Sequence, residues 1–190
     1  TVAPGSANRI GFISEKAYTV PGQMLISKIK AFFDMNQPIN AVVVTEGSKP
    51  VGLVMNIHLN VKLSQRYGFS LFINKPVSSM MDQNPMIVDS SETIEDVAAK
   101  AMQREPSRLY DHIIVVKNEV LHGIVSVRTI LNFMVEEQRE RTNILERYAT
   151  KLEQEDAEKK EIISELKGSK KMLQLVIDAI PHAVFWKDCN

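Results

Sequence analysis

One stretch of this sequence occurs twice, and that repeat restricts the fold more than any other feature. The segments Asn40–Asn60 and Asp111–Leu131 align without a gap at a constant offset of 71 residues. Each copy has a β-branched run, a short polar stretch and a second apolar run that starts at a glycine. This order predicts two strands joined by a hairpin, followed by the start of a helix.

A segment with helical periodicity precedes each hairpin, at an offset of 68, so the second copy has three extra residues near 104–110. We expect Ser90 or Ser91 to cap the second of these helices, and the first strands to cover 17–20 and 86–88. The apolar residues predicted to share one helical face are Leu25, Ile26, Ile29, Phe32 and Phe33 in the first copy, and Ile94, Val97, Ala98, Ala101 and Met102 in the second.

The repeat predicts an α+β fold with pseudo-two-fold symmetry. Each copy reads strand, helix, strand, strand, helix, and one such unit has too thin a sheet to bury both of its faces. Two units packed together can bury them, which favours a single domain made of two halves over two independent domains.

This element order, present twice, resembles a tandem CBS pair of the kind found in bacterial multidomain signalling proteins. The stretches LYDHIIVVKNEVLHGIVSVRTIL and YGFSLFINKPVSSMMDQNPMIV carry the resemblance, with KPVSSMM as a short helix leading into the second repeat. The resemblance covers roughly Ile10 to Glu136 and implies an N-terminal extension at 1–9, a first repeat at 10–83 and a second at 84–130. It also implies a homodimer that binds AMP, ATP or another adenosyl ligand in a cleft between the repeats, with no metal required.

CBS pairs hold ribose and phosphate with the motif Gly-apolar-x-Thr/Ser-x-x-Asp, where a hydroxyl and a helix N-terminus meet the phosphate. In the second copy Ser126 keeps the hydroxyl, but Thr129 stands in the place of the carboxylate. In the first copy Met55 and His58 replace both groups. Losing an acceptor for a buried ribose costs on the order of 1–3 kcal/mol, so the second copy is the better candidate site.

The resemblance implies a ligand cleft in which Arg128 meets a phosphate and His112 lines the base pocket. The alternative is that Ser126 simply caps the last helix and His58 lies on a helix surface, which would make the pair a ligand-free dimerisation platform. The candidate residues are Gly123, Ser126, Arg128, Thr129, His112, Ile113, Ile87, Met55 and His58.

From Leu131 onward the pattern changes to a heptad repeat with charged residues between the apolar ones, and we expect a coiled coil over 131–180. Mostly Leu at d with β-branched residues at a favours a parallel dimer. Asp156 and Lys159 interrupt the seam, which leaves open a plain linker, a switchable region or a solvated single helix. The predicted interface residues are Leu131, Val135, Leu145, Ala149, Leu152, Ile163, Leu166, Leu173 and Ile177.

The last residues, LQLVIDAIPHAVFWKDCN, resemble the beginning of a PAS domain, with a helix ending at Ile180-Pro181 and a strand after it. We therefore expect 181–190 to be the start of a PAS domain. The resemblance further implies that a diguanylate cyclase or histidine kinase output domain of the same chain reads the state of the repeats.

Composition narrows the function classes. Lys and Arg number 23, as do Asp and Glu, so the net charge is zero and nothing favours a nucleic-acid partner. One cysteine allows no internal disulfide, which favours a cytoplasmic location, and no stretch is apolar enough to span a bilayer. Phosphate-loop, nucleophile-elbow and zinc-protease motifs are absent, as is any metal-ligand spacing. We therefore expect a regulatory module with no catalytic residues and no metal site.

Overall fold

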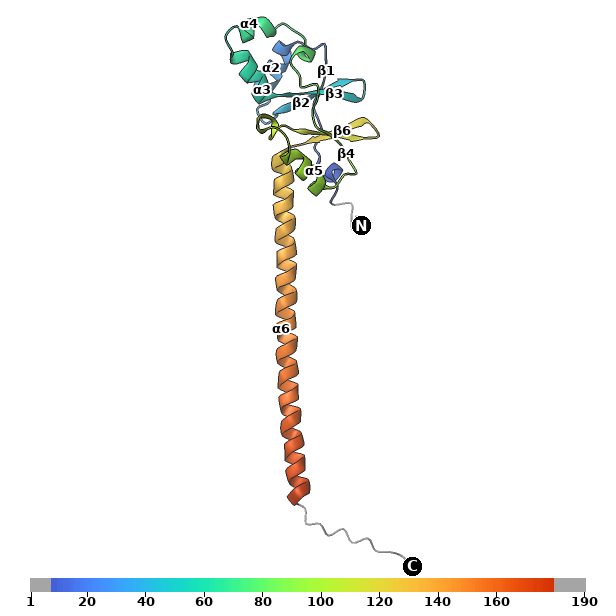
Figure 1. The fold of residues 1–190 in the computed structure, drawn as a ribbon, viewed down its shortest axis with the longest axis vertical. Coiled ribbons are helices and arrows are strands. Elements are labelled where there is room, and N and C mark those ends of the chain that lie inside the picture. The colour runs from blue at the N-terminus through green and yellow to red at the C-terminus, as the bar shows by residue number, and fades with distance from the viewer. Residues whose placement is uncertain (1–7, 180–190) are drawn as a thin grey trace, which may run out of the picture. The chain divides into compact units, whose positions relative to one another are not determined.

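A computed structural model describes residues 8–179 of the chain (Figure 1). The chain forms two compact units, one ending at Glu137 and the other beginning at Gln138. The first unit contains all the strands, and the second is entirely helical within the described residues.

The first unit contains the predicted element order twice, which confirms an α+β fold built from a repeat. The first repeat has β1 (Thr19–Pro21), α2 (Ile26–Met35), β2 (Ala41–Glu46), β3 (Lys49–Met55) and α3 (Asn56–Ser64). The second has β4 (Ile87–Asp89), α5 (Ile94–Met102), β5 (Ile113–Lys117), β6 (Val120–Val125) and the start of α6 (Val127–Ala179). Four short helices lie outside this order: α1 (Ile10–Ile13), α4 (Gly68–Phe72) and the 3-10 helices η1 (Val77–Ser79) and η2 (Pro106–Arg108).

The two sheets have the same topology and the same register. In each, the first strand pairs in parallel with the second, which pairs antiparallel with the third. Val43 lies opposite Leu53 in the first hairpin, and Ile114 lies opposite Ile124 in the second. Both hairpins also carry a bulge at the same place, between the first and second residues after Val43 and Ile114. The offset of 71 residues therefore holds for backbone pairing as well as for sequence.

Alternation along the strands divides the core into three clusters. Val42 and Val44 point toward the helices of their own repeat, while Val43 points toward the other repeat. Each repeat has its own cluster, and a third cluster lies between the two sheets. The buried members of this third cluster are Ala41, Val43, Leu53, Met55, Ile114 and Ile124. Packing of β3 against β6 thus joins the halves into one core (Figure 1).

The segment that leads into each repeat packs on the opposite repeat. The amide of Ile10, in α1, donates to the carbonyl of Glu92 at 2.9 Å, and Ile10 is fully buried in the core of the second repeat. The amide of Val77, in the 3-10 helix η1 (Val77–Ser79), donates to the carbonyl of Met24 at 2.8 Å in the first repeat. The short helix expected in KPVSSMM is therefore present, but the sequence did not reveal this exchange of lead-in segments.

The repeated glycine is explained by the same exchange. Glu15 and Ile124 exchange two backbone hydrogen bonds, at 2.8 and 2.9 Å, directly beside Gly123. A Cβ on Gly123 would collide with the Glu15 carbonyl oxygen, which is backbone and has little room to move. Gly52 is approached in the same way by the chain at Asp82. Each returning strand begins three residues before its glycine, and the glycine is needed where a lead-in segment crosses the strand.

Several local predictions need correction. The cap of α5 is Thr93, whose hydroxyl accepts from the Asp96 amide at 3.2 Å, whereas Ser91 instead bonds the carboxylate of Asp89 in a local turn. The first strands begin one or two residues later than expected. Met102, predicted to face the core, is half exposed because it is the last residue of its helix.

The helix α6 contains 53 residues, Val127–Ala179, and only Val127 and Ile130 are buried. In the second unit every described side chain, from Gln138 to Ala179, is exposed, including the apolar seam residues. The expected PAS start and the helix end at Ile180 lie outside the described residues. Across residues 8–179, no helix combines the length and the apolar character that a bilayer crossing requires.

Candidate functional site

A hydrogen-bonded histidine–aspartate pair joins the two repeats at their boundary. His58 lies on α3 of the first repeat, and Asp111 lies just before β5 of the second. The distance between His58 Nε2 and Asp111 Oδ1 is 2.7 Å. The Asp111 side chain is 8 % exposed, and Asp111 is the one charged residue that is buried within residues 8–179. A buried carboxylate of this kind requires hydrogen-bonding partners, and His58 supplies one from the opposite repeat.

Arg104 orders the loop on which Asp111 lies. Its guanidinium donates to three backbone carbonyls, those of Ala101 at 3.2 Å, Leu109 at 2.9 Å and Asp111 at 3.1 Å. Burial lowers the pKa of Arg104 from its ordinary value, an effect that the charge of Asp111 partly opposes. The three residues that the second copy gains over the first belong to this loop. The inserted segment is therefore ordered by the hydrogen bonds of Arg104.

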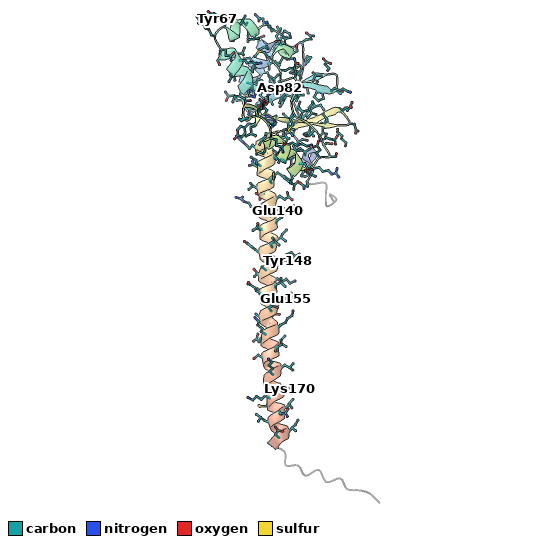
Figure 2. The ribbon with its side chains drawn as sticks, viewed as in Figure 1. Tyr67, Asp82, Glu140, Tyr148, Glu155 and Lys170 are labelled. Atoms are coloured by element: carbon teal, nitrogen blue, oxygen red, sulfur yellow. The ribbon has the colours of Figure 1, made fainter. Side chains whose placement is uncertain are left out.

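A second side-chain contact, an ion pair, crosses the same boundary. Arg108 Nη1 donates to both carboxylate oxygens of Asp82, at 3.2 and 3.0 Å. Asp82 is anchored to the first repeat, because its backbone exchanges two hydrogen bonds with Leu53 at 2.8 and 3.0 Å. Arg108 lies at the end of η2 in the second repeat. Asp82 is labelled in Figure 2, among the side chains of the first unit.

The His58–Asp111 and Asp82–Arg108 pairs lie in a cleft between the repeats. Two adjoining hollows, of about 410 and about 550 Å³, open at this boundary. They share four lining residues: Asp82, Asn84, Arg108 and Asp111. The smaller hollow extends to Met86 and His112, and the larger one to His58 and Lys62. We call the combined space the inter-repeat cleft.

His112 lines this cleft and carries a buried polar atom. Its Nδ1 is buried and has no hydrogen-bond partner among the described residues. Burial lowers the pKa of His112 below its ordinary value, while the nearby charges of Glu15 and Asp111 act in the opposite direction. The lowered pKa favours the neutral imidazole, whose Nδ1 is a donor or an acceptor, depending on the tautomer.

The structure separates the candidate residues into groups. His58 and His112 line the inter-repeat cleft. Ser126 and Thr129 instead bond to each other: the Thr129 amide donates to Ser126 Oγ at 3.0 Å, and the two hydroxyl oxygens are 2.9 Å apart. Ser126 thus caps α6. Met55 is 7 % exposed and packs in the cluster between the sheets.

The remaining candidates are not among the residues that line the inter-repeat cleft. Gly123 is covered by the backbone at Glu15, and Ile113 lies in the core of the second repeat. Ile87 is half exposed on β4, and Arg128 is exposed in the first turn of α6.

Sequence reasoning missed the charged residues that make contacts across the cleft: Asp82, Arg108 and Asp111. Two of them lie in or directly after the segment near 104–110 that the second copy has gained, which was visible as a change of offset. Nothing in the sequence indicated that Asp82 would meet Arg108, because 26 residues separate them. No group of three or more His, Cys, Asp or Glu side chains suitable for a metal ion occurs in residues 8–179.

Comparison with known proteins agrees with this architecture. The CBS domain family model matches residues 77–136. Solved structures with a similar fold include a CBS-domain-containing protein from Agrobacterium tumefaciens (TM-score 0.55, 21 % identity, 70 % of this chain and 98 % of the other). Another is the CBS-pair protein CBSX2 from Arabidopsis thaliana (TM-score 0.57, 18 % identity, 69 % and 96 %). A third is a Pyrobaculum aerophilum CBS domain protein complexed with AMP (TM-score 0.53, 21 % identity, 64 % and 88 %).

No curated protein matches this sequence. The structural likenesses, all at low identity, bear on the fold alone, and the family match covers the second repeat together with its lead-in segment. Residues 77–136 therefore match the CBS domain model, and the fold of the first unit is similar to that of CBS-pair proteins.

Proposed function

We propose that this chain is a regulatory module that senses an adenosine-type nucleotide in the inter-repeat cleft. The observation that carries the proposal is that both repeats contribute charged groups to one cleft, through the pairs His58–Asp111 and Asp82–Arg108. A ligand bound there touches both halves at once and can change how they pack. The solved CBS structures include complexes with AMP and with ATP, which supports an adenosine nucleotide as ligand.

The chemistry of the cleft suits a phosphorylated ligand. Arg108 can exchange the carboxylate of Asp82 for a phosphate, since guanidinium binds both groups in the same bidentate manner. Lys62 adds a second cation from the first repeat. His112 Nδ1 can form a hydrogen bond with the base, which would satisfy its unpaired buried atom. No metal ion is needed for these contacts.

The proposed layout has a first CBS repeat at 10–83, a second at 84–130 and a coiled coil over 131–180. The protein is then a homodimer, held by the repeat pair and by a parallel coiled coil through the predicted seam. The ligand state would pass along the helices to an output domain of the same chain, of the PAS with diguanylate cyclase or histidine kinase type, in the cytoplasm. The seam residues are apolar and exposed in the single chain, which supports burial against a second copy.

A second candidate function is a ligand-free dimerisation platform. Two observations favour it: the hydroxyls of Ser126 and Thr129 are already paired, and Met55 fills the space between the sheets. Ser126, Thr129 and Met55 occupy positions that hold the ribose and phosphate in the CBS motif.

A thermal-shift titration with AMP, ATP, S-adenosylmethionine and guanine nucleotides separates the two functions. A ligand at 100 times its Kd stabilises the folded chain by about 2.7 kcal/mol, which raises the Tm. Arg108→Gln should abolish the shift, whereas Arg66→Gln, a matched loss of one guanidinium outside the cleft, should leave it unchanged. If none of these ligands raises the Tm of the unaltered chain, the platform function is favoured.

A further inference from the structure

The centre of the predicted seam on α6 carries two charges. Continuing the heptads from Leu131 places Asp156 at an a position and Lys159 at the next d position. Both side chains are exposed in the single chain, as is the rest of the helix beyond Gln138. Glu155, labelled in Figure 2, and Lys160 flank them at the g and e positions. We call these four residues the central charge cluster.

A parallel, in-register pairing places the opposite charges of this cluster together. In such a coil each d side chain fits a hole that includes the partner's preceding a residue. Lys159 would therefore lie beside Asp156 of the partner subunit, and this contact occurs twice by symmetry. Charges at g and at the following e position also face each other between helices. Glu155 would face Lys160 of the partner subunit, in addition to its contact with Lys151 on its own helix at 4.0 Å.

A shift of one heptad destroys this match. Asp156 would then lie against Ile163 of the partner subunit, and Lys159 against Leu166 of the partner subunit. Placing a charge against an apolar side chain without a partner is costly. Apolar layers alone discriminate weakly between such registers, because Leu and Ile side chains pack with one another in either one.

An antiparallel pairing about the same centre keeps the cluster but breaks the seam elsewhere. Asp156 would still meet Lys159 of the partner subunit. Lys170, however, would lie against Leu145 of the partner subunit, and the polar Gln138 would lie against apolar Ile177 of the partner subunit. Of these three pairings, only the parallel, in-register one places every polar seam residue against a polar one and every apolar residue against an apolar one. Each seam residue then meets its own copy within a layer, and the opposite charges of Asp156 and Lys159 meet between adjacent layers.

We propose that the central charge cluster fixes the register of a second copy of this chain on α6, while Lys170 and Gln138 disfavour the antiparallel orientation. This inference rests on the proposed homodimer and adds what specifies its alignment. A polar position in a coiled-coil seam lowers stability and selects one register. The interrupted heptads at Asp156 and Lys159 are thus a specificity element rather than a defect in the seam.

Disulfide trapping tests this proposal on the full chain. In a Cys189→Ser background, Ala149→Cys introduces one thiol at a seam a position. In a parallel, in-register dimer the two thiols are adjacent, whereas in the antiparallel pairing they are about 25 Å apart at 1.5 Å per residue. We expect the unaltered cluster to give a high yield of disulfide-linked dimer under mild oxidation.

Charge reversals then address the cluster itself. Asp156→Lys alone, or Lys159→Asp alone, puts four like charges in adjacent layers, and the dimer dissociation constant should rise by about a factor of ten or more. The double reversal D156K/K159D restores opposite charges and should recover most of the disulfide yield. Glu161→Lys, on the opposite face of the helix, is the matched control and should behave as the unaltered chain.

The outcomes separate the two levels of the proposal. If sedimentation shows the unaltered chain to be a monomer, the proposed homodimer fails. If the chain is a dimer but both single reversals dissociate and cross-link like the unaltered chain, the dimer stands and the role of the cluster is wrong. Strong cross-linking of Ala149→Cys that neither reversal disturbs has the same meaning.

Discussion

The same backbone junction occurs in both repeats, yet it is built from opposite chemistry. In the first repeat Met55 precedes the helix, is almost fully buried and has no capping side chain. In the second repeat Ser126 occupies that position and caps α6 through the Thr129 amide. Three residues further on, His58 forms a hydrogen bond with Asp111 of the opposite repeat, whereas Thr129 bonds within its own turn.

The difference shows that one fold position can serve either packing or capping. Met55 contributes apolar surface to the cluster between the sheets, and its helix begins without a side-chain cap. Ser126 satisfies an amide that would otherwise lack a partner. The consequence for function is that polar groups of both repeats meet at the first junction, through His58. At the second junction the side chains of Ser126 and Thr129 bond to each other. Four predictions test this comparison.

The largest effect is expected at Met55. Met55→Ala removes a buried side chain between the sheets and should lower the free energy of unfolding by about 2–5 kcal/mol. The measurement is urea denaturation of the full chain followed by circular dichroism. The isosteric exchange Met55→Leu is the control and should cost less than about 1.5 kcal/mol. A small effect of Met55→Ala would mean that the two sheets do not share a tight core.

The next largest effect is expected at the repeated glycine, where replacement by alanine should cost more stability in the second repeat than in the first. Gly123→Ala forces a Cβ into the Glu15 carbonyl oxygen, whereas Gly52→Ala meets mainly the flexible Met81 side chain, with the Asp82 carbonyl oxygen at 3.0 Å. We expect Gly123→Ala to destabilise the chain by about 1–3 kcal/mol, and Gly52→Ala by less. Paired melting curves of the two variants provide the comparison. Equal losses would show that the two crossings are equally tight.

Ser126→Ala should cost about 1 kcal/mol, because the Thr129 amide loses its acceptor at the start of α6. Ser126→Asp is the matched control, since a carboxylate also accepts from this amide, and it should retain most of the stability. Chemical denaturation measures both. A Ser126→Ala variant that is as stable as the original would leave Ser126 without a structural role and would strengthen its assignment to ligand binding.

The smallest effect is a pH dependence that arises at His112, where the aligned residue of the first repeat is Ala41. Burial lowers the pKa of His112 in the folded chain, so below about pH 6.5 the unfolded chain binds more protons at this residue than the folded chain does. The free energy of unfolding should therefore fall as the pH drops below 6.5. His112→Gln should flatten that slope, measured by denaturation between pH 5 and pH 8. An unchanged slope would show that His112 is not the group responsible.

Much of the first unit was predictable from local patterns. The β-branched run in each copy and the glycine in each returning strand predicted both hairpins, and the structure shows that the two hairpins share one register. Helical periodicity likewise located α2 and α5 to within a residue or two. The candidate cleft was predictable only in part, because His58 and His112 line it while Ser126 and Thr129 do not.

The sequence by itself determined the repeated unit, its two hairpins and most of the apolar face of each helix, because each of these follows from the spacing of neighbouring residues. Only the tertiary structure decided that the lead-in segments exchange between repeats and that His58 meets Asp111 while Asp82 meets Arg108. Such contacts join residues far apart in the chain and have no periodicity to reveal them. They depend on which faces become adjacent once two similar halves have packed together. The packing of all the buried apolar residues determines those faces.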